Sequence, residues 1–228
     1  MTSDRIESGQ RRARKRDPEI HQDVRAELSI EQDGATRSIE VSVRHGVVFL
    51  TGVVDSYAEK WAIDRAVRRI VGVRDLRDNL HVRPPDTAAL NDRLIARTAD
   101  LALVWDARVP NGIRADVIDG VLRLRGAVER FCQREAAEEA VRNLMGVRDI
   151  VNEIALLPAV PPADLVLVVE AALRRRLGSA SRLIFVDAAE GAVTLRGPVP
   201  TFAILDEIER AVWSIHGVTQ IDNQLQVS

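Results

Sequence analysis

The chain has 228 residues, a formal net charge of −2 and a single cysteine, Cys132. A charge this close to zero gives no overall basic field that would attract nucleic acid, and one cysteine excludes both an intrachain disulfide framework and a multi-cysteine zinc site. Hydrophobic residues make up 46% of the sequence, as in a globular protein, but no apolar run is long enough to span a membrane.

Residues 1–17 are predicted to form a disordered basic tail. A polar, charged terminus of this kind is usually solvated; the alternative is a short basic patch for anionic lipid or nucleic acid. The segment lacks the apolar core of a secretory signal, so the sequence as written predicts a cytoplasmic protein. The cations of the tail lie in the run RRARKR and are Arg11, Arg12, Arg14, Lys15 and Arg16.

The first structural unit is predicted to begin at residue 18 with a helix. Its apolar residues recur every four positions over 20–28, which places them on one face. Apolar and polar side chains then alternate over residues 38–44, as in a half-buried strand. A two-residue turn at His45-Gly46 leads into a second strand, because glycine readily takes the positive φ that tight hairpin turns require.

The second half of this unit is a helix followed by a third strand. The helix is predicted to begin at Ser56, which has capping-box spacing to Glu59, and to end at Gly72, as a left-handed glycine ends many helices. A strand with one apolar face follows up to residue 82. Gly52, within the second strand, indicates a bulge or the close approach of another backbone segment. The unit therefore reads α-β-β-α-β.

The whole pattern occurs three times. In every copy three glycines are separated by six and then twenty residues, and the copies lie 74 and 71 residues apart. Such a repeat predicts tandem modules, here over residues 18–84, 88–158 and 162–228, with stiff proline-containing joints between them. We expect an α+β fold in which each module packs two helices on a three-stranded mixed sheet. The glycines are expected to be structural, and they are Gly46, Gly52, Gly72, Gly120, Gly126, Gly146, Gly191, Gly197 and Gly217.

An aromatic residue recurs where each module enters its second helix. These residues are Tyr57, Phe131 and Phe202. One interpretation is that each ring staples its helix to the core. The other is that the rings are apolar tips exposed for a lipid or a protein partner.

A short polar residue also recurs on the apolar face of each third strand. These residues are Asp78, Asn152 and Asn223. Such side chains are expected to satisfy backbone groups near a turn rather than to bind a ligand.

No catalytic or metal-binding pattern is found. The four histidines are scattered singly, none recurs between copies, and no histidine lies near Cys132 in the sequence. Phosphate-binding glycine motifs are missing, as is the GXXG loop that a KH-type RNA-binding module needs. We therefore expect a protein that is not an enzyme, has neither cofactor nor metal, and does not bind nucleic acid.

The glycine pattern resembles the BON domain, the bacterial osmotically inducible and nodulation domain. The matching stretches are GVVFLTGVV and GVRDLRD, GVLRLRGAV and GVRDIVN, and GAVTLRGPV and GVTQIDN. The resemblance covers residues 18–228 and implies a sandwich of two helices on a three-stranded sheet. It also implies non-enzymatic work, namely phospholipid or envelope binding and protection against osmotic stress. Many members of this family are exported or lipid-anchored, whereas this sequence carries neither a signal nor a lipobox cysteine.

Three copies in one chain suggest avidity, because weak contacts reinforce one another when their geometry permits. The leading hypothesis is a stress-linked adaptor that engages anionic phospholipid surfaces or a protein partner. Its contact residues would be the three recurring aromatic rings and the basic run of the tail. The alternative is a cytoplasmic module that senses ions or small ligands.

Overall fold

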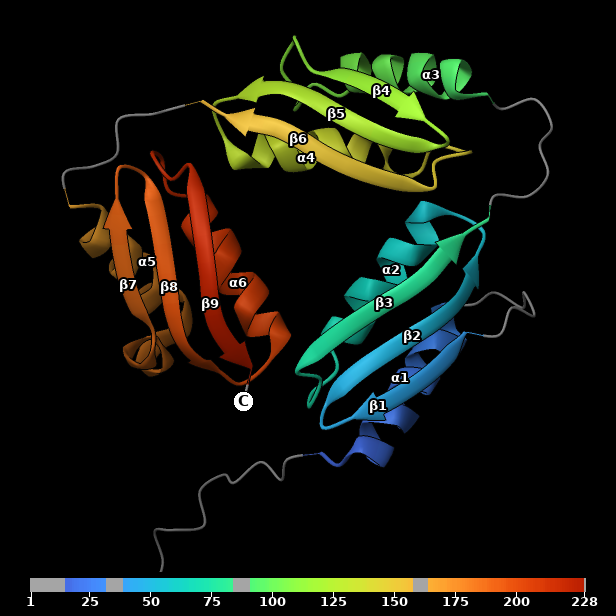
Figure 1. Cartoon of the computed structure of the whole chain (residues 1–228). Coiled ribbons are helices and arrows are strands. Elements are labelled where there is room, and N and C mark those ends of the chain that lie inside the picture. The colour runs from blue at the N-terminus through green and yellow to red at the C-terminus, as the bar shows by residue number, and fades with distance from the viewer. Residues whose placement is uncertain (1–14, 32–38, 84–90, 158–163, 228) are drawn as a thin grey trace, which may run out of the picture.

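The computed structural model describes residues 15–31, 39–83, 91–157 and 164–227 and shows three modules of the same design (Figure 1). The first comprises α1 (Asp17–Glu31), β1 (Glu40–Arg44), β2 (Val47–Val54), α2 (Tyr57–Arg68) and β3 (Asp75–Val82). The second comprises α3 (Asp92–Trp105), β4 (Arg114–Ile118), β5 (Val121–Val128), α4 (Phe131–Arg142) and β6 (Asp149–Leu156). The third comprises α5 (Leu165–Leu177), the 3-10 helix η1 (Gly178–Leu183), β7 (Phe185–Ala189), β8 (Ala192–Val199), α6 (Phe202–Trp213) and β9 (Gln220–Val227).

Each module contains a mixed three-stranded sheet, as predicted. The second strand of the module is central: it pairs antiparallel with the first strand and parallel with the third. The parallel pairing is possible because the second helix provides the crossover connection. Both helices cover the same face of their sheet and enclose a core of aliphatic side chains, while the other face is left open in Figure 1.

The fixed glycine spacing has a spatial cause. His45 and Gly46 both have positive φ in the hairpin turn, and the amide of Arg74 donates a hydrogen bond of 2.8 Å to the Gly46 carbonyl oxygen. A Cβ on Gly46 would lie 3.0 Å from the carbonyl oxygen of Gly72. The other two modules repeat this contact, so the first and third glycines of each copy meet where the hairpin turn touches the chain that enters the third strand.

The glycine within each central strand is approached closely by the backbone that leads into the hairpin. A Cβ on Gly126 would lie 2.9 Å from the carbonyl oxygen of Gly112, and one on Gly197 would lie 2.2 Å from that of Leu183. Of the two interpretations offered by the sequence, the close backbone approach therefore describes these two modules.

The structure differs from the sequence-based expectation at the end of α2 and in the connection before β7. Helix α2 ends at Arg68, with Arg69 as a right-handed cap, so Gly72 lies in the following turn rather than next to the helix end. At the other end of α2, Ser56 caps the helix as expected, and the carboxylate of Glu59 accepts a hydrogen bond from the amide of Asp55. The 3-10 helix η1 was not anticipated, because its sequence GSASRL has no apolar periodicity.

Candidate functional site

The three modules are arranged around a common centre. Figure 1 shows α2, α4 and α6 on the inner side and α1, α3 and α5 on the outer side. Since α2, α4 and α6 are the second helices of their modules, the recurring aromatic residues all begin helices that face this centre. We call this region the central junction.

Each recurring aromatic residue contacts the next module. Tyr57 of the first module packs against the core of the second, and Phe202 of the third lies within the core of the first with only 7% of its surface exposed. Phe131 of the second module stacks on Trp213 of the third, with ring centroids 4.3 Å apart. The contacts run from module one to two, two to three and three to one, so the ring of modules is closed.

Two of these rings meet equivalent positions of the neighbouring inner helix. Phe202 lies beneath the guanidinium of Arg68, 5.3 Å from the ring centroid, and Phe131 meets Trp213. Arg68, Arg142 and Trp213 occupy the same place in their copies, separated by the repeat offsets. The rings thus join neighbouring modules, and their contact with a lipid or partner stays a prediction.

Charged side chains fill the remainder of the central junction. A cavity of about 630 Å³ opens among the three inner helices. Burial raises the pKa of Asp206, against the opposing charges of Arg68 and Arg210, and burial likewise raises the pKa of Glu135. Residues of all three modules line the cavity: Trp61, Asp64, Arg65, Arg68, Phe131, Glu135, Glu138, Glu139, Arg142, Asp206, Glu209, Arg210 and Trp213.

Trp61 has no aromatic equivalent in the other copies and joins the first two modules. The guanidinium carbon of Arg142 lies 3.5 Å from the Trp61 ring centroid, and that of Arg65 lies 4.9 Å from it. Arginine over an indole face is the most favourable cation–π pairing. Glu138 lies 3.8 Å from Arg142, one turn earlier on the same helix.

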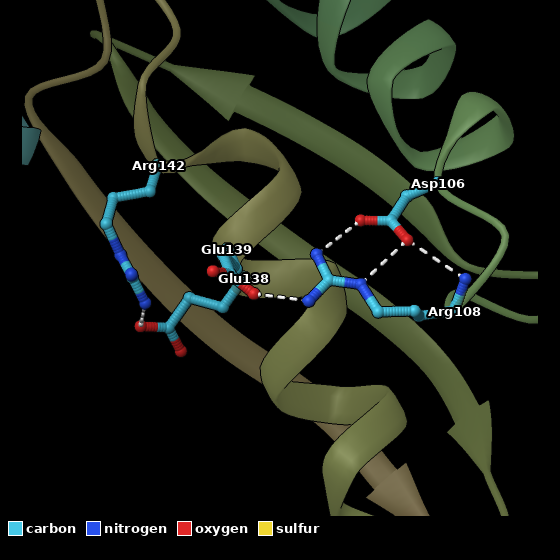
Figure 2. A network of polar contacts seen from close by, with 5 residues as sticks. All are labelled: Asp106, Arg108, Glu138, Glu139 and Arg142. Atoms are coloured by element: carbon cyan, nitrogen blue, oxygen red, sulfur yellow. Dashed lines mark hydrogen bonds and ion pairs between the residues drawn. The ribbon is translucent and has the colours of Figure 1, made fainter.

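Figure 2 shows how the polar contacts of α4 continue into its own module. The guanidinium of Arg108 donates hydrogen bonds of 2.7 Å to both Asp106, just after α3, and Glu139, on α4. The segment after α3 is thereby tied to the helix that faces the central junction. Arg142 and Glu138 point away from this cluster on the same helix (Figure 2).

The recurring polar residues of the third strands tie strand to helix. In each copy the side-chain oxygen accepts a hydrogen bond from the amide two residues further along the strand. The remaining polar group turns to the inner helix: Asn152 and Asn223 donate to Glu138 and Glu209, whereas Asp78 lies 3.7 Å from Lys60. The expected bonding to backbone groups is present, but within the strand rather than near a turn.

Only part of the basic tail is placed. Lys15 forms an ion pair with Asp23, and the Asp17 carboxylate accepts hydrogen bonds from the amides of His45 and Gly46 at 2.7 and 2.9 Å. Asp17 therefore belongs to the first module rather than to the tail. Arg16 precedes it and is exposed. Three predicted cations lie outside the described residues: Arg11, Arg12 and Arg14.

Sequence reasoning missed an exposed apolar surface on α3. Trp105, Val104 and Leu101 expose 84, 74 and 60% of their surfaces, and Leu94 at the start of the helix exposes 44%. These residues follow one face at helical spacing, opposite the buried face of the same helix. We call them the α3 apolar strip. Helix α3 thus has apolar residues on two faces, and this could have been found from the sequence.

Arginines border the α3 apolar strip. Arg93 and Arg97 are exposed on the same side of the helix as Val104, and no ion pair joins either of them to another described residue. The three acidic residues of this region are engaged by the fold: Asp92 accepts from the amides of Asp119 and Gly120, Asp100 from that of Ala115, and Asp106 from Arg108. The strip is therefore apolar at its centre and cationic along one border.

Among the described residues, no group of three or more histidine, cysteine or acidic side chains is placed to hold a metal ion. Within the same residues, no helix is long and apolar enough to cross a membrane. Cys132 is exposed on α4.

The chain is similar to one curated protein and, more distantly, to several solved structures. Osmotically-inducible protein Y of Escherichia coli (strain K12) is 27% identical over 143 residues, which cover 60% of this chain and 71% of that protein. Among solved structures, CdsD, a structural protein of the type III secretion system of Chlamydia trachomatis, matches with 14% identity and a TM-score of 0.26 over 91% of each chain. The periplasmic domain of PrgH from S. typhimurium matches with 11% identity and a TM-score of 0.23, over 84% of this chain and all of that one.

The family model of the BON domain matches three consecutive stretches. They are residues 16–84, 91–158 and 166–228, and each coincides with one α-β-β-α-β module of the structure. The resemblance seen in the glycine pattern is confirmed. The chain belongs to the BON domain family, with three copies in tandem.

Proposed function

We propose that this chain is a non-enzymatic, stress-linked adaptor that attaches to anionic phospholipid surfaces through module two. The observation that carries the proposal is the α3 apolar strip with its arginine border. A helix that offers an exposed tryptophan and aliphatic side chains beside arginines fits the boundary between lipid headgroups and acyl chains. The similarity to osmotically-inducible protein Y supports the link to stress.

The tail and the ring of modules assist this attachment. The basic run of residues 11–16 adds attraction to anionic headgroups, worth about 1 kcal/mol per cation near the surface. The aromatic contacts of the central junction hold the three modules together, so that a contact made by α3 positions the whole ring at the surface. Neither the strip nor the tail is expected to be sufficient alone, because stable interfacial binding commonly needs two signals.

Co-sedimentation with lipid vesicles tests the proposal. We expect the chain to pellet with vesicles that contain phosphatidylglycerol, to pellet less at 500 mM than at about 50 mM salt because screening weakens attraction, and to stay in solution with pure phosphatidylcholine. The combined variant Leu101→Ser, Val104→Ser and Trp105→Ser should lose most of this binding and keep its melting temperature, since all three side chains are exposed.

Two further variants serve as controls. Deleting residues 1–14 should remove most of the binding and its salt dependence; the deletion stops before Lys15 because Lys15 and Asp17 contact the first module. The variant Leu183→Ser with Phe185→Ser removes exposed apolar residues of module three and should bind vesicles normally. Unchanged vesicle binding by the α3 variant would refute the proposal.

A further inference from the structure

Module three has a corner that the described connection between α3 and β4 of module two lacks. Between α5 and β7 the chain forms the 3-10 helix η1, and a cavity of about 690 Å³ opens beside it. Its walls are partly aliphatic, from Leu173 and Ile184, and partly charged, from Arg174, Arg182 and one carboxylate, Glu170. The cavity lies between η1 and the edge strand β7, since residues of both line it.

The strand at this edge can accept another strand. The sheet order is β7-β8-β9, and among the described residues β7 pairs only with β8. The outer edge of such a strand presents backbone N–H and C=O groups, and an extended peptide can add to it as a further strand. In this mode main-chain hydrogen bonds supply affinity, and the surroundings of alternate side chains supply specificity.

The two sides of β7 offer different surroundings. Val186 and Ala188 pack toward the helices and the core, while Phe185 lies on the open face of the sheet with 71% of its surface exposed. Glu40 and Arg114 occupy the position of Phe185 in the first two modules. An added strand would therefore direct alternate side chains toward the helix side of the cavity and toward Phe185, an exposed aromatic ring that also lines the cavity and is particular to module three.

The charge around this edge is strongly positive. The arginines 174–176 end α5 and Arg182 lies in η1, against two acidic residues in α5, η1 and β7, namely Glu170 and Asp187. No ion pair joins any of these arginines to another described residue. Carboxylates on an incoming strand would supply the missing partners, since arginine binds carboxylates by charge-assisted hydrogen bonds.

We propose that the outer edge of β7 binds an extended acidic segment of a partner protein as a fourth strand. Its acidic side chains face Arg174 and Arg182 in the cavity, and its apolar side chains cover Phe185. This site is separate from the α3 apolar strip, so that the chain can attach to a surface through module two and hold a protein through module three.

Fluorescence anisotropy with labelled ten-residue peptides tests this proposal on the full chain. We expect binding by a peptide of alternating glutamate and valine, and no binding by its lysine counterpart. A third peptide keeps the glutamates but replaces alternate valines by proline, which cannot donate ladder hydrogen bonds; we expect it not to bind. Equal binding of the proline peptide would show a merely electrostatic contact and would overturn the proposal.

Protein variants locate the site. The variant Arg174→Ser with Arg182→Ser should weaken binding of the glutamate–valine peptide about tenfold or more. The matched control, Arg175→Ser with Arg176→Ser, removes the same charge from arginines that do not line the cavity and should have a clearly smaller effect. Phe185→Ser should also weaken the complex. If both arginine pairs have equal effects, or neither has any, the assignment to this cavity is wrong.

Different variants test the vesicle-binding proposal and the peptide-binding proposal. The α3 variant, with Leu101, Val104 and Trp105 changed to serine, should bind the acidic peptide as the unchanged chain does. The Arg174 and Arg182 variant should in turn retain most of its binding to vesicles. A melting curve of every variant excludes loss of folding as the cause of lost binding.

Discussion

At the scale of single residues, the repeat is maintained by a contact between two backbone segments. The hairpin glycine and the glycine after the second helix are 26 residues apart in each copy, yet the missing Cβ of the first leaves room for the carbonyl oxygen of the second. For Gly120 and Gly146 the distance would be 3.0 Å, which is too short for a Cβ without movement of the backbone. Both the positive φ of Gly120 and the close approach of the Gly146 carbonyl oxygen therefore favour glycine at this position.

We predict that Gly120→Val destabilises module two by about 3 kcal/mol or more, because strain and a backbone clash combine. Thermal unfolding followed by circular dichroism measures the effect. Gly112→Val is the matched control: Gly112 also has positive φ, at +100°, but nothing lies within 4 Å of its added Cβ. Gly112→Val should lower the free energy of unfolding only by the backbone strain of a valine at positive φ. A melting temperature of Gly120→Val within a degree of the unchanged chain would contradict the assignment, and the same expectation applies to Gly46 and Gly191.

At the scale of elements, each third strand is tied to its inner helix by a pair of side chains that differ in chemistry but fit each other. In modules two and three an asparagine amide donates to a glutamate of the helix. In module one the strand carries Asp78, which forms an ion pair with Lys60 of the inner helix. Lys60 lies one turn before Asp64 on that helix. Opposite or complementary groups are thus kept at a half-buried contact, where an unpaired polar group is costly.

We predict that Asn223→Asp destabilises module three by about 1–3 kcal/mol at neutral pH. The new carboxylate would meet the Glu209 carboxylate at the present 2.6 Å contact, and the donor of that hydrogen bond would be lost. Urea unfolding at pH 7 and pH 4 measures the change, which should shrink at the lower pH because one of the two carboxylates then holds a proton.

Adding Glu209→Gln to this variant should restore most of the stability, because the glutamine amide can donate to the new carboxylate. Destabilisation that is the same at both pH values and is not rescued by Glu209→Gln would mean that like-charge contact is not the cause.

At the scale of the whole molecule, three aromatic residues in equivalent places close the ring of modules. Each extends from the start of an inner helix to the neighbouring module. A domain of about 70 residues buries a small share of its surface and is marginal alone. Contacts at all three junctions therefore add stability that no single module could provide.

Tyr57 offers a direct test of the ring because it is the only tyrosine of the chain. Burial, and then the negative charges of Glu138 and Asp149 in module two, raise its pKa from 10.0 to about 12. An absorbance titration near 295 nm should thus give a midpoint well above that of the chain unfolded in guanidinium. Because the folded state keeps a proton that the unfolded state loses between about pH 10 and 12, this group lowers stability as pH rises through that window.

A matched variant isolates the contact between modules one and two. Glu138→Gln removes a module-two charge that raises the Tyr57 pKa, so the midpoint should fall while burial keeps it above 10.0. Glu27→Gln, on the outer helix of module one, should leave the midpoint unchanged. A midpoint near 10.0 in the unchanged folded chain would show that Tyr57 does not pack against the second module in solution.

The sequence by itself determined the module. Three local patterns predicted it: the glycine spacing, the alternation in the strands and the apolar periodicity of the helices. Each pattern lies within a single copy, so three α-β-β-α-β units with mixed sheets could be predicted from them. Helix ends were less certain, as at Gly72, because the last turns depend on how the chain passes the neighbouring hairpin.

Only the tertiary structure decided what Tyr57, Phe131 and Phe202 contact. An aromatic residue at the start of a helix suits a core, a surface tip or a junction equally well, since burial energy depends on area and not on which module supplies the covering atoms. For the same reason, the sequence shows two apolar faces on α3 but not which of them stays uncovered. Local patterns state that a side chain is apolar or a strand extended, whereas the packing of three modules decides which of these surfaces is left uncovered.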